Sequence, residues 1–418
     1  MNSLKFLFLI CSLNVSVFNS QSLVYDDFVY KDNIKTPMCY LEGDMLSAPY
    51  IELESGRLKV RFDDISDEIK DYYYTVIHCD YQWNPSDLDK LDYMTGFFEN
   101  TITESEGSFN TQTDYIHYQF SFPNDMTGVS ISGNYLMVVY EDGDEENVII
   151  SRRFVVYEQL VNIDTHLKEA TNISDSRFRQ EIDVKVFFPN YAIDNPYSDF
   201  HLTIMQNNRW DNAITNLQPR FVKSGELNYD YNEENVFDGG NEFREFNLSK
   251  LQMATNQVAR TELTEGRWTA YLRTDPSRSY KHYITNKDIN GNFYIVNKDG
   301  FEQHVEEEYV WVRFSLKQDY RTNTPIYIFG KMTDWQCKNE FLMKYNSENK
   351  VYTNTVLLKQ GYYNYVYAIY DENQIDITSI EGTHFDTENE YTVIAYNTDF
   401  VAGYDRVVGV TKTNSFNR

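Results

Sequence analysis

The chain has 418 residues, and its 37 basic and 64 acidic side chains give a formal charge of 37 − 64 = −27. This acidic excess argues against nucleic-acid binding, which needs Lys and Arg to displace counterions from phosphates, and against adhesion to anionic membranes. With 41% hydrophobic residues the chain can form packed cores, and its 35 Tyr and 27 Phe against 18 Gly and 9 Pro favour strands. We therefore expect an all-β protein of about two to four domains.

Residues 1–22 are predicted to be a cleavable secretory signal peptide. Lys5 precedes a mostly apolar run from Phe6 to Phe18, and small and polar residues follow at Ser20–Ser22. The run is too short to span a bilayer, which needs about 20 apolar residues. We expect export without an anchor. The mature chain would keep Cys39, Cys79 and Cys337, enough for at most one disulfide.

Residues 23–158 are predicted to form an N-terminal β-sandwich. The turn Ser55-Gly56 lies between Ile51–Glu54 and Arg57–Phe62, in which apolar and charged residues alternate, a pattern typical of a β-hairpin. Side chains alternate in Tyr72–Cys79, so that His78 and Cys79 face opposite sides of a strand and cannot form a catalytic dyad. Further strands are expected in the ranges Tyr115–Phe122, Tyr135–Tyr140 and Val148–Tyr157.

The remaining chain is divided into a middle sandwich, residues 159–303, and a C-terminal sandwich, residues 304–418. The middle block includes a strand at Phe200–Gln206, a long polar stretch from Asn207 to Glu245 that we expect to be irregular but ordered, and a turn at Asn290-Gly291. The C-terminal strands are expected at Tyr309–Leu316, Pro325–Phe329, Tyr352–Leu358, Tyr362–Ile369 and Tyr391–Tyr396. The fold class is thus tandem immunoglobulin-like or early-set β-sandwiches with very little helix.

No motif for catalysis, cofactors or metals is found. The sequence has no nucleophile elbow, P-loop or dinucleotide fingerprint. Asn286, Asp288 and Asn290 have the spacing of a calcium loop, but position 12 of that loop is Asn297 rather than Glu, so a turn is the better interpretation. We predict a protein that is not an enzyme. A glycosidase remains an alternative, and it would need two carboxyl groups about 5–10 Å apart in a cleft.

Two Trp-containing motifs and a Gly-Gly motif supply candidate interface residues. Aromatic and Arg side chains flanked by polar groups fit either a protein interface or a buried network. We expect Arg209 to bind a carboxylate such as Asp211 or Glu242 in bidentate fashion. The candidate interface residues are Trp83, Asn84, Arg209, Trp210, Asp211, Asn241, Glu242 and Arg244.

The C-terminal block resembles the early-set modules that bind glycogen. The resemblance rests on Gly330–Trp335 and on the hairpin Leu357–Tyr365. In those modules the Trp that matches Trp335 stacks on a sugar, but a second Trp is missing between Tyr370 and Ile377, and Val366 replaces the usual Lys. The resemblance implies the fold. We expect Trp335 to be a core residue, and a secreted glycan-binding protein is the alternative function.

The whole mature chain resembles the type IX secretion system plug protein family. The resemblance rests on strings in the family's order, which are HCDYQWNPSDL (78–88), SRRF (151–154), QNNRWDNAI (206–214), GGNEFR (239–244), LKQGYYNY (358–365) and EGTHFDTENEY (381–391). It implies a non-enzymatic periplasmic protein of Bacteroidota. Such a protein docks on the giant outer-membrane translocon β-barrel and plugs its periplasmic end, without a cofactor, without nucleic acid and without inserting into the membrane.

Overall fold

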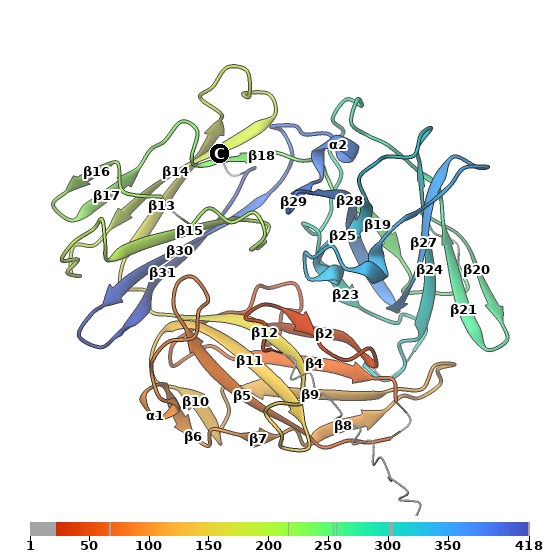
Figure 1. The fold of residues 1–418 in the computed structure, drawn as a ribbon, viewed down its shortest axis with the longest axis horizontal. Helices are drawn as coiled ribbons and strands as arrows, with labels where there is room; N and C mark the ends of the chain where they lie inside the picture. The colour runs from red at the N-terminus through yellow and green to blue at the C-terminus, as the bar shows by residue number, and fades with distance from the viewer. Residues whose placement is uncertain are drawn as a thin grey trace, which may run out of the picture.

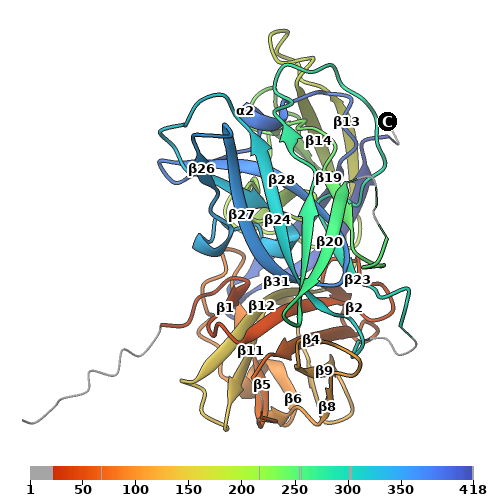
Figure 2. The same ribbon diagram turned by 90° about the vertical axis from the view of Figure 1, so that its right-hand side faces the viewer.

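The computed structural model describes residues 22–66, 68–215, 217–253, 255, 257–300 and 304–416. The predicted signal peptide falls almost wholly outside these ranges. Three β-sandwiches lie around a common centre, as Figure 1 shows, and Figure 2 gives the same arrangement from the side. Within the described residues only two four-residue α-helices and two 3-10 turns interrupt the strands, which confirms the all-β prediction. None of the helices there has the length and apolar character of a membrane span.

The first sandwich contains two main sheets. Their inner faces meet in a core that includes Tyr72, Tyr74, Val76 and Phe154. One sheet has the order β1-β12-β11-β5-β7, with β3 added parallel to β12, and the other has the order β2-β4-β9-β8. The elements are β1 (Phe28–Val29), β2 (Ile34–Leu41), β3 (Tyr50–Glu52), β4 (Leu58–Asp64), β5 (Tyr72–Cys79), α1 (Lys90–Tyr93), β6 (Met94–Gly96), β7 (Asn100–Thr101), β8 (Glu104–Gly107), β9 (Ile116–Phe122), β10 (Thr127–Val129), β11 (Gly133–Glu141) and β12 (Val148–Tyr157).

The hairpin predicted around Ser55-Gly56 is wrong. Strand β3 pairs with β12, whereas β4 pairs with β2 and β9, so the turn passes from one sheet to the other. A Cβ atom on Gly56 would lie 2.4 Å from Cβ of Ile51. The glycine is needed for this close approach of the chain to itself, and not for a two-residue hairpin.

The second sandwich combines the middle of the chain with its C-terminal end. One sheet has the order β13-β14-β17-β16 with β18 paired to β14, and the other is β15-β30-β31. Strands β15 and β30 pair in register from Phe200 opposite Asn397 to Gln206 opposite Tyr391. The elements are β13 (Asn162–Glu169), β14 (Arg179–Phe187), β15 (Phe200–Gln206), β16 (Phe221–Lys223), β17 (Glu226–Tyr229), β18 (Val236–Asp238), β30 (Glu390–Asp399) and β31 (Tyr404–Asn414).

The third sandwich takes its strands from both sides of the predicted border at residue 303. One sheet has the order β20-β21-β24-β27-β26 with β22 paired to β24, and β28 pairs with β19, β23, β25 and β29 opposite it. The elements are β19 (Arg244–Asn247), β20 (Val258–Thr264), β21 (Arg267–Leu272), β22 (Asp275–Pro276), β23 (Phe293–Ile295), β24 (Tyr309–Lys317), β25 (Ile326–Phe329), η1 (Lys331–Thr333), η2 (Asn339–Phe341), β26 (Lys344–Asn346), β27 (Val351–Lys359), β28 (Gly361–Asp371), β29 (Gln374–Asp376) and α2 (Thr378–Glu381).

These pairings correct the predicted domain borders. The ranges 159–303 and 304–418 were expected to be separate sandwiches, but β19 to β23 belong with the third sandwich, and β30 and β31 belong with the second. Neighbouring strands in sequence pair only in about two-thirds of cases, so contiguity is a weak guide. The stretch from Asn207 to Glu245 is also more regular than expected, since it contains β16, β17 and β18.

The first and second sandwiches share a core. Alternate residues of β11, Leu136, Val138 and Tyr140, face away from the first core and belong to one buried cluster with Ile394 and Tyr396 of β30 and Val407 of β31. Both sheets at this contact are therefore apolar on both faces. Separating the two sandwiches would expose this core to water, and so the junction favours one fixed arrangement of the two sandwiches.

Candidate functional site

The motif residues gather where the three sandwiches meet. The chain turns sharply after β15 at Asn207 and Asn208, whose φ angles are +55° and +54°. Asn adopts this left-handed conformation more readily than most residues. The amide of Asn207 donates to Asn389 Oδ1 at 2.7 Å, and that of Asn208 donates to Glu390 Oε1 at 2.9 Å. The anchored turn directs the next two side chains toward different sandwiches.

Trp210 is directed to the first sandwich, where it meets Trp83. The two rings are 5.0 Å apart and nearly perpendicular, at 86°. The guanidinium of Arg153 lies 4.5 Å from the ring centre of Trp83 and 5.7 Å from that of Trp210. Trp83 is 6% exposed and has a φ of +69°, an unusual value for a bulky residue. The turn that imposes this conformation is closed by Asn84, whose amide donates to Asp80 Oδ2 at 2.9 Å.

Arg209 is directed to the third sandwich. Its guanidinium lies 5.0 Å from the ring centre of Trp335 and 5.3 Å from that of Phe329. Nε and Nη2 donate to the two carboxylate oxygens of Asp211 at 3.1 Å and 2.6 Å, which confirms the predicted bidentate pair. Trp335 is 6% exposed and packs on Phe329 and Phe243. It is a core residue, as expected, and offers no free face for a sugar.

The Gly-Gly motif carries the chain from the second to the third sandwich. A Cβ atom on Gly239 would lie 2.0 Å from the carbonyl oxygen of His384, so only glycine fits there. The amide of Asn241 donates to the carbonyl oxygen of Glu381 at 2.8 Å. Glu242 is buried and accepts a hydrogen bond from the hydroxyl of Tyr283. These contacts fix the crossing segment at both ends.

Arg244 is the centre of a buried ionic network in the third sandwich. Its guanidinium lies 2.9 Å from Asp275 Oδ1, and Nε is within 3.1 Å of both oxygens of Glu381. The hydroxyls of Tyr365 and Tyr367 also donate to Asp275, at 2.7 Å and 2.9 Å. Burial alone would raise the pKa of Glu381, but Arg244 and Arg278 outweigh it and lower that pKa. Glu381 is therefore ionised at neutral pH.

A second buried network joins the first and third sandwiches at Asp63. One carboxylate oxygen contacts Nζ of Lys359 at 2.6 Å and accepts from the hydroxyl of Tyr309 at 2.7 Å, and the other lies 2.6 Å from Nδ1 of His117. Burial opposes ionisation of Asp63, yet Lys359 and His117 lower its pKa. No sequence motif indicated this network, because residues 63 and 359 are brought together only by the tertiary fold.

The structure buries four of the eight predicted interface residues, whereas Trp210 and Asn241 are half-buried and Asn84 and Asp211 are exposed. Trp83, Arg209, Glu242 and Arg244 are buried, and their contacts lie within the chain. Such side chains cannot touch a partner while the sandwiches stay docked. Trp83 and Arg209 contact a neighbouring sandwich, whereas Arg244 belongs to the network inside the third sandwich. An outer contact surface formed by the other four residues stays a prediction. Arg153 belongs to the junction at Trp83, and the one signal for it was its place in the string SRRF.

The cysteines and one acidic cluster are further candidates for a reactive or metal-binding centre. Cys39, Cys79 and Cys337 are free thiols, and burial raises the pKa of Cys39 and of Cys79 to about 12. Glu181, Asp183 and Asp230 bring carboxylate oxygens within 4.8 Å of one another. The ammonium of Lys168 already lies 3.1 Å, 2.6 Å and 3.9 Å from them, which neutralises part of their charge. The turn predicted at Asn290 and Gly291 is confirmed, with φ of +52° and +77°, although the following strand β23 pairs with β28 and not with a strand before the turn.

The three sandwiches are joined by buried aromatic and ionic contacts, and together they form a rigid multidomain β-protein. Residues 34–158 match the family described as type 9 secretion system plug protein 1st domain. The crystal structure of a hypothetical protein from Parabacteroides merdae is 31% identical, with a TM-score of 0.90, over 94% of this chain and 100% of that one. No curated protein matches. Residues 34–158 thus belong to the first-domain family of type 9 secretion system plug proteins.

Proposed function

We propose that this protein is a non-enzymatic component of the type IX secretion system that plugs the giant outer-membrane translocon barrel. It would reach the periplasm through its signal peptide and close the barrel from that side. The observation that carries this proposal is the family match over residues 34–158. The family name links such proteins to type IX secretion, whereas docking on the barrel is our own step beyond it.

The physical form of the chain suits occlusion. A plug must keep its shape while it fills a pore, so its domains should not move relative to one another. Here Trp83, Trp210 and Arg153 join the first two sandwiches, while Arg209 contacts Phe329 and Trp335 of the third. Burial of these groups makes separation of the sandwiches costly. This rigidity supports the proposal independently of the family match.

The burial of Trp335 argues against the glycan-binding alternative. A sugar platform needs one open aromatic face, but the ring of Trp335 lies beneath Phe329, Phe243 and the guanidinium of Arg209. A carbohydrate could reach this ring only after the second and third sandwiches had separated. We therefore favour protein–protein contact as the function of the molecule.

Affinity purification from solubilised outer membranes tests the proposed partner. The tagged protein should co-purify with one very large barrel protein, and recovery without such a barrel would overturn the docking proposal. Two variants are compared in the tests of function. Trp83→Ala removes the contact with Trp210, and Trp311→Ala, the control, removes a Trp of β24 that is 37% exposed.

Drug uptake tests occlusion itself. Cells that lack the protein should admit large hydrophilic antibiotics through open barrels. Complementation with Trp311→Ala should restore the barrier, and Trp83→Ala should restore it less completely because the plug is less rigid. Unchanged uptake in the deletion strain, with the barrel present in normal amount, would mean that another component closes the pore.

A further inference from the structure

One side of the third sandwich is an open sheet surface. The sheet β20-β21-β24-β27-β26 packs its inner side on the core through residues such as Val312 and Phe314. Successive side chains of a strand point to opposite faces, so Trp311, Arg313 and Lys317 of β24 point outward, and all three are exposed. This side lies at the right-hand edge of the molecule in Figure 1 and faces the viewer in Figure 2. We call it the outer sheet face.

The outer sheet face is positively charged in a strongly acidic chain. Its five strands carry five exposed basic side chains and one exposed acidic side chain, an excess of four positive charges where the whole chain has a formal charge of −27. The basic residues are Arg260, Arg267, Arg313, Lys317 and Lys344, and the acidic residue is Glu262. The exposed charges of the turns at the strand ends balance one another, and so the excess remains. They are Glu265, Asp319 and Glu348 against Arg273, Arg321 and Lys350.

Four of the five basic side chains form no ion pair with any residue that the structure describes. These four are Arg267, Arg313, Lys317 and Lys344. Arg260 is the exception, since its guanidinium lies 2.7 Å from Glu262 and 3.8 Å from the ring centre of Tyr271. The charge of the other four is therefore available to an anionic partner.

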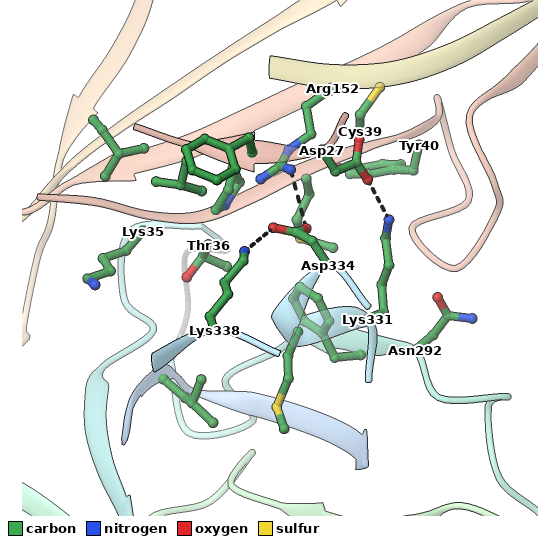
Figure 3. A pocket seen from close by; sticks show the side chains of 18 of the residues that line it. Asp27, Lys35, Thr36, Cys39, Tyr40, Arg152, Asn292, Lys331, Asp334 and Lys338 are labelled. Atoms are coloured by element: carbon green, nitrogen blue, oxygen red, sulfur yellow. Dashed lines mark hydrogen bonds and ion pairs between the residues drawn. The ribbon is translucent and has the colours of Figure 1, made fainter. Parts of the chain in front are cut away.

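The basic side chains between the first and third sandwiches differ in this respect, because they have carboxylates of the same chain beside them. Figure 3 shows these groups around a cavity of about 230 Å³. Lys331 lies 3.0 Å from Asp27. Lys338 and Arg152 lie 2.7 Å and 3.3 Å from Asp334. The unpaired positive charge of the outer sheet face is thus not shared by this second basic group.

Aromatic side chains lie among the cations of the outer sheet face. Thr269 of β21 is opposite Trp311, and Tyr271 is opposite Arg313, so the two rings belong to neighbouring outward rows of the sheet. Trp and Tyr are the aromatic residues enriched where a membrane meets water. With about 4.8 Å between strands and about 3.4 Å between residues, the rows from Trp311 to Lys317 cover about 19 Å by 20 Å. Cations distributed over such an area match the distributed negative charge of a lipid surface.

We propose that the outer sheet face binds the surface of an anionic phospholipid membrane without inserting into it. Each Lys or Arg near such a surface strengthens binding about fivefold, so four unpaired cations supply several hundredfold. The acidic remainder of the protein opposes contact only within the Debye length, which falls from about 30 Å at 0.01 M salt to about 8 Å at 0.15 M. Near physiological salt, therefore, the face that touches the lipid outweighs the net charge. This site goes beyond the proposed plugging function and does not depend on it.

Sedimentation with lipid vesicles tests the proposal on the whole protein. At about 0.15 M salt, vesicles of phosphatidylglycerol and phosphatidylcholine in equal parts should bind at least about tenfold more tightly than pure phosphatidylcholine vesicles, and about 1 M salt should remove this difference. Equal binding to the two kinds of vesicle, or a difference that does not change with salt, would overturn the proposal. Binding to soluble heparin without binding to the anionic vesicles would also overturn it, because the partner would then be a soluble polyanion.

Charge-reversing variants locate the site. Arg313→Glu and Lys344→Glu change exposed side chains, and each should weaken binding to the anionic vesicles at least about tenfold. The matched control is Lys223→Glu, which makes the same change in net charge on β16 of the second sandwich, where the side chain is 64% exposed. It should leave the affinity within about twofold. An equal loss in Lys223→Glu and in Arg313→Glu would mean that net charge alone decides binding and would overturn the assignment to the outer sheet face.

Discussion

Arg244→Met should destabilise the protein strongly, because it leaves two carboxylates buried without their main cation. Arg244 is 7% exposed and pairs with Asp275 and Glu381. Removing one partner of a buried ion pair costs about 3–5 kcal/mol. Glu381 keeps Arg278 at 2.7 Å, so we expect a value near the lower end, about 3 kcal/mol. That is a large part of a typical free energy of unfolding of about 5–15 kcal/mol.

Guanidinium chloride unfolding followed by Trp fluorescence measures this loss at pH 7. The matched control is Arg179→Met, since Arg179 also lies 2.9 Å from a carboxylate, that of Asp238, but both side chains are 45% exposed. A surface pair of this kind contributes less than about 1 kcal/mol. If both variants lost the same small amount of stability, the buried-network interpretation of Arg244 would be refuted.

Wild type and Arg244→Met should also differ in how their free energy of unfolding depends on pH. The pKa of Glu381 is lowered in the folded wild type from an ordinary value of 4.5, so its stabilising contribution is present above that pH and is lost as the pH falls. In Arg244→Met this contribution is smaller. The gap in unfolding free energy between wild type and variant should therefore be widest near neutral pH and narrow below about pH 4. A gap independent of pH would indicate lost packing alone.

Three further predictions concern Trp335, Trp83 and Asp288. Trp335→Ala should cost about 3–5 kcal/mol in thermal or denaturant unfolding, and an unchanged midpoint would contradict its burial. Trp83→Ala should increase amide hydrogen exchange in the turn that carries Trp210 before it affects β24, whereas uniform exchange would contradict a local role for this contact. Burial raises the pKa of Asp288 from 3.8 to about 7, so its stabilising contribution is complete below about pH 4 and is lost as the pH rises through 7. Asp288→Asn should remove that decline in unfolding free energy, and an unaltered pH profile would contradict it.

The sequence by itself determined many of the strands and the resemblance to the plug protein family, which the match over residues 34–158 supports. Alternating side chains in Tyr72–Cys79 and Tyr309–Leu316 predicted β5 and most of β24, because successive Cβ atoms of a strand point to opposite faces whatever the strand pairs with. Two residues in the family strings are also restricted by local backbone geometry or packing. Gly239 and Asn207 occupy positions whose backbone geometry or close contacts few other residues tolerate.

Only the tertiary structure decided which strands pair and which motif residues are buried. The pairing of β30 with β15 joins segments nearly 200 residues apart, and no local pattern encodes such a partner. Likewise, Trp83 and Trp210 are each flanked by polar residues, so their sequence context favours an exposed contact as much as a buried one. Trp83 is buried and Trp210 is half-buried because the first and second sandwiches dock face to face and place the two rings 5.0 Å apart. Burial depends on what the rest of the chain brings to a residue, and this is why the same motif predicted an outer interface and formed an inner one.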